Sequence, residues 1–351
     1  MPVTRQPIGI TPDGITVERF TLHGYARIEA DILTYGGTLV SLRSPDRNGV
    51  MGDVILGFDS LDAYLGVHPY LGALVGRYAN RIAGGRFHLG DHEYVLARNN
   101  GPNHLHGGPG GFHRQVWHAQ TFELPEGPGV ELHYLSRDGE EGFPGNLSVT
   151  VTYTLAGAAL RIDYLATTDR ETVLNLTNHA YFNLAGGGDI LGHVLQIPAE
   201  HIVPVDETLI PTGELAKVAG TPFDFRKPTL VGARIGVDDE QLRRAGGYDH
   251  TWVIDKAPGE LGLVARLTEP SSGRMLKVIT TEPGVQFYTG NMIECGMAGR
   301  GGQTYTRYSG LCLEAQHFPD SPNQSSFPST ILRPGNVYRQ TTIYWLSLAP
   351  H

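Results

Sequence analysis

The stretch Leu147-Ser-Val-Thr-Val-Thr-Tyr-Thr-Leu-Ala-Gly-Ala-Ala-Leu-Arg-Ile-Asp-Tyr164 decides the fold class of this 351-residue chain. Apolar side chains occupy every second position in both halves: Leu147, Val149, Val151, Tyr153 and Leu155 before Gly157, then Leu160, Ile162 and Tyr164 after it. Successive side chains of a strand point to opposite faces, so each half has one apolar face. The pattern predicts a long β-hairpin with one buried face.

Further segments with strand character lie on both sides of this hairpin, at 130–134, 252–254, 262–267, 275–281, 285–289 and 337–348. Helical patterning is scarce: we expect one helical turn after a capping Ser60 and one short helix within 238–245. The 46 glycines and 23 prolines supply the turns that many short strands need. We find no internal repeat, linker or domain boundary. The sequence predicts an all-β protein: one large, mostly antiparallel β-sandwich with few short helices, formed by residues 1–351 as a single domain.

Composition narrows the partners and the compartment. The formal net charge is −9 and no basic stripe is visible, which argues against a nucleic-acid partner. No apolar run is as long as a membrane span, and residues 1–9 do not resemble a secretory signal. Two cysteines, Cys295 and Cys312, fit a reducing compartment rather than a disulfide scaffold. We therefore expect a cytoplasmic protein without membrane association.

The stretch Leu311-Cys-Leu-Glu-Ala-Gln-His-Phe-Pro-Asp320 begins as an apolar strand and places a carboxylate near its end. Alternation predicts that Glu314 and Gln316 leave by the face that Leu311 and Leu313 do not use. A carboxylate in such a position is costly unless it has partners or a function. An ion pair with a lysine or arginine at the sheet rim is the structural alternative.

Two further polar clusters precede the central hairpin. Arg81, beside Asn80 in an apolar context, needs a carboxylate or a ligand oxygen if it is buried, and an internal ion pair would serve equally well. His104 and His106 stand two residues apart before Gly107-Gly108, so on a strand they would share a face and could bind a metal. Because the expected further ligands are absent from the sequence, we predict no metal site.

Two more clusters follow the central hairpin. His179 lies between an apolar run, 173–176, and the aromatic pair Tyr181-Phe182; a histidine satisfied within the core is the alternative. Asp249 occupies a tight polar elbow before the strand at 252–254, where it could simply cap the turn. No Gly-x-Ser-x-Gly elbow supports a serine hydrolase.

Taken in order, the polar clusters resemble signatures of the aldose 1-epimerase (galactose mutarotase) family. The similar segments are Gly76-Arg-Tyr-Ala-Asn-Arg-Ile82, Asn103-His-Leu-His-Gly-Gly108, Thr177-Asn-His-Ala-Tyr-Phe-Asn-Leu184, Tyr248-Asp-His250, Gly284-Val-Gln-Phe-Tyr-Thr-Gly-Asn291, Leu313-Glu-Ala-Gln-His-Phe-Pro-Asp-Ser-Pro-Asn323 and Phe327-Pro-Ser-Thr-Ile-Leu-Arg-Pro-Gly335. The resemblance implies a large β-supersandwich that binds a sugar in a groove on one sheet. It also implies interconversion of the α and β anomers of a free aldose, such as galactose or glucose, without cofactor or metal.

The same resemblance implies roles for seven residues. The general base of the family matches Glu314, its general acid matches His179, and its second active-site histidine matches His106. Contacts to sugar hydroxyls match Asn80, Arg81, Asp249 and Gln286. The segments 107–115 and 185–244 carry no signature on which a role could be based.

Three alternative functions stay open at this point. A hexose-6-phosphate 1-epimerase of similar fold would need a cationic phosphate pocket, and no paired arginine cluster is visible among the signatures. A non-catalytic sugar-binding protein would not need both Glu314 and His179. A glycosidase on a related sandwich would use two carboxylates. We expect a small-molecule aldose as the partner and a monomer or homodimer as the assembly.

Overall fold

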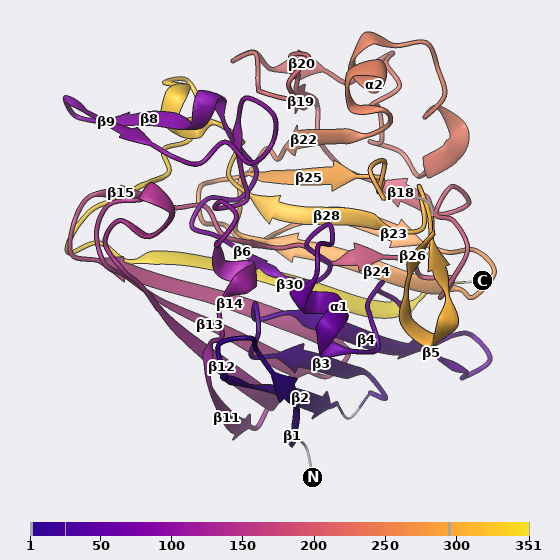
Figure 1. The fold of residues 1–351 in the computed structure, drawn as a ribbon. Coiled ribbons are helices and arrows are strands. Elements are labelled where there is room, and N and C mark those ends of the chain that lie inside the picture. Colours follow the sequence, from indigo (N-terminus) through magenta and orange to yellow (C-terminus); the bar gives the residue numbers. More distant parts are fainter. Residues whose placement is uncertain (1–2, 25, 294–295, 351) are drawn as a thin grey trace.

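The computed structural model describes residues 3–24, 26–293 and 296–350, so Cys295 lies outside the described residues. Within these ranges strands dominate, and the α-helices are the two short ones α1 (Leu61–Leu65) and α2 (Glu240–Ala245) (Figure 1). Every pairing between described strands is antiparallel. The prediction of a mostly antiparallel all-β architecture with few short helices is confirmed.

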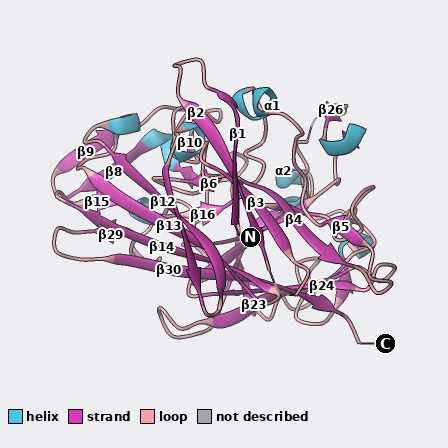
Figure 2. Ribbon diagram, turned by 90° about the horizontal axis from the view of Figure 1, so that it is seen from below, coloured by secondary structure: helices cyan, strands magenta, loops and turns pink. Residues whose placement is uncertain are grey.

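The largest sheet is built around the predicted hairpin. Its strand order is β11 (His118–Leu124), β12 (Gly127–Ser136), β13 (Leu147–Ala156), β14 (Ala159–Thr168), β30 (Tyr338–Leu348), β24 (Arg274–Thr280), β23 (Gly262–Thr268), β18 (Val194–Gln196) and β21 (Thr229–Leu230). β13 and β14 pair in register from Ala156 opposite Ala159 to Leu147 opposite Thr168. Figure 2 shows β12, β13, β14 and β30 running side by side in this sheet.

Two other sheets pack with it. The second sheet has the order β17 (Tyr181–Phe182), β28 (Leu311–Gln316), β25 (Gly284–Tyr288), β22 (Asp249–Val253), β19 (His201–Val203) and β20 (Ala216–Lys217). The N-terminal sheet consists of β1 (Val3–Ile10), β2 (Thr16–His23), β3 (Glu29–Leu33), β4 (Leu39–Pro45) and β5 (Met51–Asp53). Two-stranded pairs complete the described structure: β6 (Leu74–Val75) with β16 (Thr177–Asn178), β7 (Arg81–Ile82) with β10 (His104–Leu105), β8 (Arg86–Leu89) with β9 (His92–Val95), β15 (Thr172–Val173) with β29 (Ile331–Leu332), and β26 (Met297–Ala298) with β27 (Thr304–Tyr305).

One continuous hydrophobic core joins the three sheets. It contains Phe20 from the N-terminal sheet, Val151 and Leu132 from the largest sheet, and Phe287 and Leu313 from the second sheet. Burial of apolar surface is the main favourable contribution to folding, so sheets that share a core stabilise one another. In the described residues the three sheets therefore share one core, and a single domain stays the prediction.

The segment around His179 differs from the expected apolar strand. Instead of one strand, residues 172–182 make three two-residue pairings in succession, with β29, then β6, then β28. The apolar run predicted burial correctly, since Val173, Leu174 and Leu176 are buried. It could not predict the change of partner, because burial on all sides removes the alternation that marks a strand. His179 consequently lies between two sheet partners.

Both helices form where the sequence indicated. The Asp239 side chain caps α2 by accepting hydrogen bonds from the backbone N–H groups of Gln241 and Leu242. The serine cap expected for α1 is wrong in one respect: Ser60 occupies the position before the helix but makes no capping hydrogen bond with its side chain. No helix in the described residues combines the length and the apolar character needed to cross a membrane.

The two faces of β14 provide a test of the predicted alternation. Ile162 is fully buried, whereas Leu165, on the opposite face of the same strand, is 36% exposed. We expect Ile162→Ala to lower the free energy of unfolding by about 2–5 kcal/mol, since it leaves a cavity in the core. Leu165→Ala should change it by no more than about 0.5 kcal/mol. Urea unfolding of both variants checks this; equal losses would contradict the assigned faces.

Candidate active site

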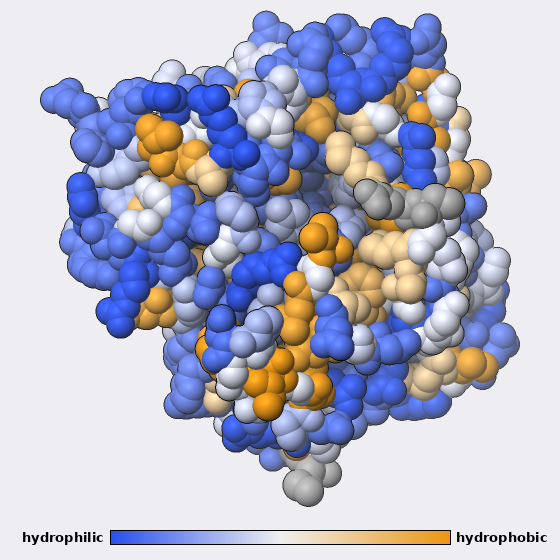
Figure 3. All heavy atoms as spheres, in the orientation of Figure 1, coloured by the Kyte–Doolittle hydropathy of each residue, from blue (hydrophilic) through white to orange (hydrophobic). Residues whose placement is uncertain are grey.

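A pocket on the second sheet brings together most of the residues singled out in the sequence. Six of the seven line it: Asn80, Arg81, His106, His179, Asp249 and Glu314. The remaining lining residues are Pro69, Tyr70, Leu105, Tyr181, Tyr288 and Met292. The seventh predicted residue, Gln286, lies behind this lining, where it donates a hydrogen bond to Asp249. The surface in Figure 3 is largely hydrophilic on this side of the molecule, with apolar side chains gathered over α1 and the N-terminal strands.

The register of three neighbouring strands positions the polar groups. Glu314 of β28 lies opposite Gln286 of β25, which in turn lies opposite Thr251 of β22. Residues directly opposite each other in an antiparallel pair share a face, so the three side chains form one row. Leu311 and Leu313 point the other way into the core, as alternation predicted. The expectation that Glu314 leaves by the other face is therefore correct.

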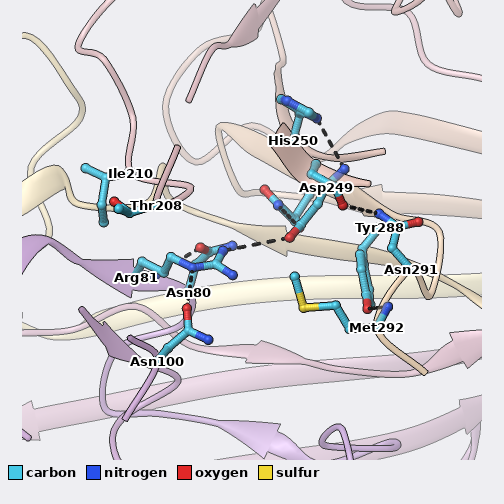
Figure 4. Close-up of polar contacts among 12 residues, drawn as sticks. Asn80, Arg81, Asn100, Thr208, Ile210, Asp249, His250, Tyr288, Asn291 and Met292 are labelled. Carbon is cyan, nitrogen blue, oxygen red and sulfur yellow. Dashed lines mark hydrogen bonds and ion pairs between the residues drawn. The ribbon is translucent and has the colours of Figure 1, made fainter. Parts of the chain in front are cut away.

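A chain of hydrogen bonds fixes one wall of the pocket. The Thr251 hydroxyl donates to the side-chain oxygen Oε1 of Gln286, and the side-chain nitrogen Nε2 of Gln286 donates to Asp249 Oδ1 at 2.6 Å. Across the pocket, Arg81 Nη1 lies 3.8 Å from Asp249 Oδ2 (Figure 4). Arg81 Nε donates to Asn100 Oδ1 at 2.9 Å. The ion pair considered for Arg81 is therefore present, and it forms within the pocket.

His106 is held by reciprocal contacts with Asn80. The backbone N–H of Asn80 donates to the ring nitrogen Nδ1 of His106 at 3.1 Å, and the backbone N–H of His106 donates to the backbone carbonyl of Asn80 at 3.0 Å. A ring nitrogen that accepts a hydrogen bond carries no proton, so a neutral His106 carries its proton on Nε2. Burial lowers the pKa of His106 well below its ordinary value, with smaller contributions from His179 and Arg81. His106 is thus a neutral donor.

The shared face expected for His104 and His106 is wrong. β10 ends at Leu105, and His106 has a φ of 52°, which turns the chain out of the strand. His104 Nδ1 instead lies 2.8 Å from the carbonyl oxygen of Ala97, and its ring meets Phe143 edge-on. This turn could not be predicted at His106, because a non-glycine residue seldom adopts a positive φ.

His179 and Glu314 face each other in the buried part of the pocket. His179 Nε2 lies 3.8 Å from Glu314 Oε2, and the residues are 4% and 2% exposed. Burial lowers the pKa of His179 to about 3. Burial also raises the pKa of Glu314 well above its ordinary value; Asp249 raises it further and Arg81 opposes the rise. Glu314 Oε2 is buried and accepts no hydrogen bond from any described residue, so it has unused hydrogen-bonding capacity.

The same residues also resemble a metal site at first sight. His106, His179 and Glu314 each offer an atom, and these atoms lie within 4.8 Å of one another. A metal ligand must present an unprotonated nitrogen. Because Asn80 occupies Nδ1 of His106, the nitrogen left over is the protonated one. The residues therefore suit a ligand that accepts a hydrogen bond better than they suit a cation.

Sequence reasoning missed three residues around the pocket. Tyr70 and Met292 line it, and Asn100 holds Arg81 from outside. Met292 and Asn100 stand in loops whose composition carries no signal for function. For Tyr70 the only local sign was the preceding Pro69, which marks a turn without indicating what the turn presents.

Comparisons with known proteins agree with this geometry. The family model described as aldose 1-epimerase matches residues 18–345. A galactose mutarotase from Mus musculus is 47% identical over 350 residues, covering 99% of both chains, and one from Sus scrofa is 46% identical with the same coverage. A solved structure of an aldose epimerase homologue from C. elegans superposes with a TM-score of 0.86 at 32% identity, covering 99% of this chain and 100% of the other. The chain belongs to the aldose 1-epimerase family of isomerases.

Proposed function

We propose that Glu314 and His179 are the acid–base pair that interconverts the α and β anomers of a neutral free aldose, such as galactose or glucose. The observation that supports this best is the 3.8 Å separation of His179 Nε2 and Glu314 Oε2 inside a pocket lined with polar groups. Both groups can reach one hemiacetal centre from this arrangement. The relatives named galactose mutarotase support the choice of substrate.

Anomer exchange requires two proton transfers and no oxidant or covalent intermediate. In ring opening, Glu314 takes the proton of the O1 hydroxyl while His179 gives a proton to O5, and the C1–O5 bond breaks as the C1 carbonyl forms. Rotation about C1–C2 then exposes the other carbonyl face. In closure, O5 attacks C1, His179 takes back its proton and Glu314 returns one to O1. The pair carries one proton throughout, so the cycle is balanced.

The shared proton lies on a different member of the buried pair from the one that ordinary pKa values would predict. Ordinary pKa values, near 6.5 for histidine and 4.3 for glutamate, would give an imidazolium facing a carboxylate. Burial moves both pKa values the opposite way, which places the proton on Glu314 in the empty pocket. That form is the one needed for ring closure. Hydrogen bonds from a bound sugar to the free Oε2 would favour the carboxylate, which is the form needed for ring opening.

The remaining polar groups would bind hydroxyls and ring oxygen. Arg81 and His106 present donors, and Asp249 presents an acceptor whose orientation Gln286 fixes. Asn80 lines the same wall and places His106. Of the lining residues, Asp249 and Glu314 are the carboxylic acids; because Asp249 already accepts from Gln286 and pairs with Arg81, a two-carboxylate glycosidase is the weaker candidate.

Charge within the pocket favours a neutral sugar over a sugar phosphate. Arg81 is the cationic lining residue, and it is already engaged by Asp249 and Asn100. A phosphate dianion would lie near two carboxyl groups without a free cation.

We also propose a cytoplasmic location, in line with the free thiol of the buried Cys312. The proposed assembly is a monomer or a homodimer.

The acid–base pair is tested by removing one member at a time. We expect Glu314→Gln and His179→Asn each to lower kcat by about 10²–10⁴-fold, the usual contribution of one positioned acid or base. Polarimetry of freshly dissolved α-D-galactose and α-D-glucose measures the rate. Glu282→Gln is the matched control, since Glu282 is a buried carboxylate that pairs with His317 outside the pocket. Full activity in either pocket variant would remove that residue from its role.

The choice of substrate is tested by charge. We expect kcat/KM on glucose to exceed that on glucose 6-phosphate by about 100-fold or more, because Arg81, the cation among the described lining residues, is already paired and a desolvated phosphate dianion would lack a partner. The two rates are measured at the same ionic strength, with the uncatalysed rate subtracted. Comparable values would favour the hexose-6-phosphate epimerase.

The dependence of the rate on pH tests the buried state of the pair. A second proton would have to enter on His179, whose pKa lies at about 3. We therefore expect kcat/KM not to fall between pH 7 and pH 5.5, since burial keeps the pKa values of His179 and His106 below this range and a raised pKa of Glu314 only retains its proton as the pH is lowered. A fall with an inflection near pH 6.5, in a protein that circular dichroism shows to be folded, would indicate a solvated imidazole instead.

A further inference from the structure

We infer that Tyr70 is a positioning residue, which holds the imidazole rings of His106 and His179 in place and shields them from water. The inference rests on the proposed function, since it concerns how the acid–base pair is held. Tyr70 carries no sequence signature and lies on the loop after α1, far from both histidines along the chain.

The first observation is that the Tyr70 ring contacts three imidazoles. It stacks on His179 with centroids 6.0 Å apart and planes 18° apart. It meets His106 edge-on at 4.7 Å and His113 edge-on at 4.7 Å. His106 and His179 also contact each other at 5.2 Å. Tyr70 therefore touches both histidines of the pocket from one side.

The second observation is that His179 is enclosed between two tyrosines. Tyr181 stacks on it at 4.9 Å with planes 19° apart, and Tyr70 lies nearly parallel at 6.0 Å. Tyr181 is buried at the base of the pocket, whereas Tyr70 is half-buried. Rotation of the imidazole would disturb both nearly parallel contacts. Of the two tyrosines, Tyr70 is the one that separates the ring from solvent.

The third observation is that the backbone ties the Tyr70 turn to His179 itself. The N–H of Gly72 donates to the His179 carbonyl, and the N–H of His179 donates to the Ala73 carbonyl, both at 2.9 Å. Ala73 also donates to the Tyr70 carbonyl at 3.0 Å, which closes the turn. The turn thus continues the pairing of β6 with β16, so the backbones that carry the two rings are held together.

The fourth observation is the backbone conformation of Tyr70, whose φ is 57°. A bulky side chain in this left-handed region costs of order 1–3 kcal/mol, and such strain persists where the surroundings require it. Asparagine and glycine adopt this conformation more readily. Tyr70 therefore occupies a conformation that its backbone preference disfavours, and the contacts of its ring are what hold it there.

Three substitutions of Tyr70 separate the ring from the backbone. Tyr70→Phe keeps the stacking ring, so we expect kcat within about twofold of the unsubstituted protein. Tyr70→Asn and Tyr70→Gly suit the backbone but remove the ring, and we expect kcat to fall about 10- to 100-fold, the effect of a small misplacement of a reacting group. KM should change less than kcat. If Tyr70→Asn folds poorly, Tyr70→Gly provides the same comparison.

A second readout does not depend on activity. The groups that face His179 are Glu314, His106, Tyr70, Tyr181 and Cys312, with His68 nearby and Arg81 and Asp249 across the pocket. NMR titration of the His179 ring should show its pKa move upward, towards 6.5, in Tyr70→Asn and Tyr70→Gly but not in Tyr70→Phe. This follows because burial is the main cause of the low value.

The outcomes distinguish this inference from the proposed function. Unchanged His179 titration and unchanged kcat in Tyr70→Asn and Tyr70→Gly would overturn the positioning role. An equal loss of kcat in Tyr70→Phe would overturn it too, since the hydroxyl and not the ring would then matter. A rise in KM alone would make Tyr70 a sugar contact and not a positioning residue. If the His179 titration moves while kcat does not, the positioning of the ring is supported and the catalytic role of His179 fails.

Discussion

The antiparallel register of β25 against β28 is the constraint on which the active site depends. Gln286 lies opposite Glu314, and this single pairing fixes which side chains share the pocket face. A shift by one residue would turn Glu314 into the core and bring Leu313 to the pocket. The shift is prevented by Leu311, Leu313 and Phe287, which fill the core on the other face. Hydrophobic burial therefore specifies the site as well as the fold.

The second constraint is the cost of burying ionisable groups. Glu314 and His179 are almost completely inaccessible, and a buried charge without partners is expensive. Burial lowers the pKa of His179 and raises the pKa of Glu314, so both groups favour their neutral forms. The pair therefore avoids two separated charges when no ligand is bound. The same burial keeps the pair sensitive to a ligand: a few hydrogen bonds from sugar hydroxyls act on groups that water does not stabilise. In the proposed mechanism, desolvation thus prepares the pair for proton exchange as well as disfavouring its charged forms.

Much of this could be predicted from the sequence, for identifiable reasons. The hairpin of β13 and β14 was predictable because one of its faces is buried and the other is not, which leaves a period of two. Glu314 stood out because a carboxylate interrupts an otherwise apolar strand. The path of residues 172–182 was not predictable, since each two-residue pairing is too short to show a period. The separation of His104 from His106 was not predictable either, because it depends on one residue with a positive φ.

That unusual conformation recurs around the pocket. Tyr70, Asn80 and His106 all have φ between 52° and 63°, and all three line the same cavity. A bulky residue such as Tyr70 costs of order 1–3 kcal/mol in this region, whereas asparagine adopts it more readily. The positive φ values orient groups toward the pocket. At Asn80 the backbone exchanges hydrogen bonds with His106, and at Tyr70 the ring contacts the imidazoles of His106 and His179. The regular strands supply Glu314 and Asp249 to the pocket, and Gln286 behind Asp249, at no such cost, because alternation already places all three on the same face of the sheet. The two sides of the site are therefore built by different means. One side follows from sheet register, and the other is held in strained turns whose energy the shared core must offset.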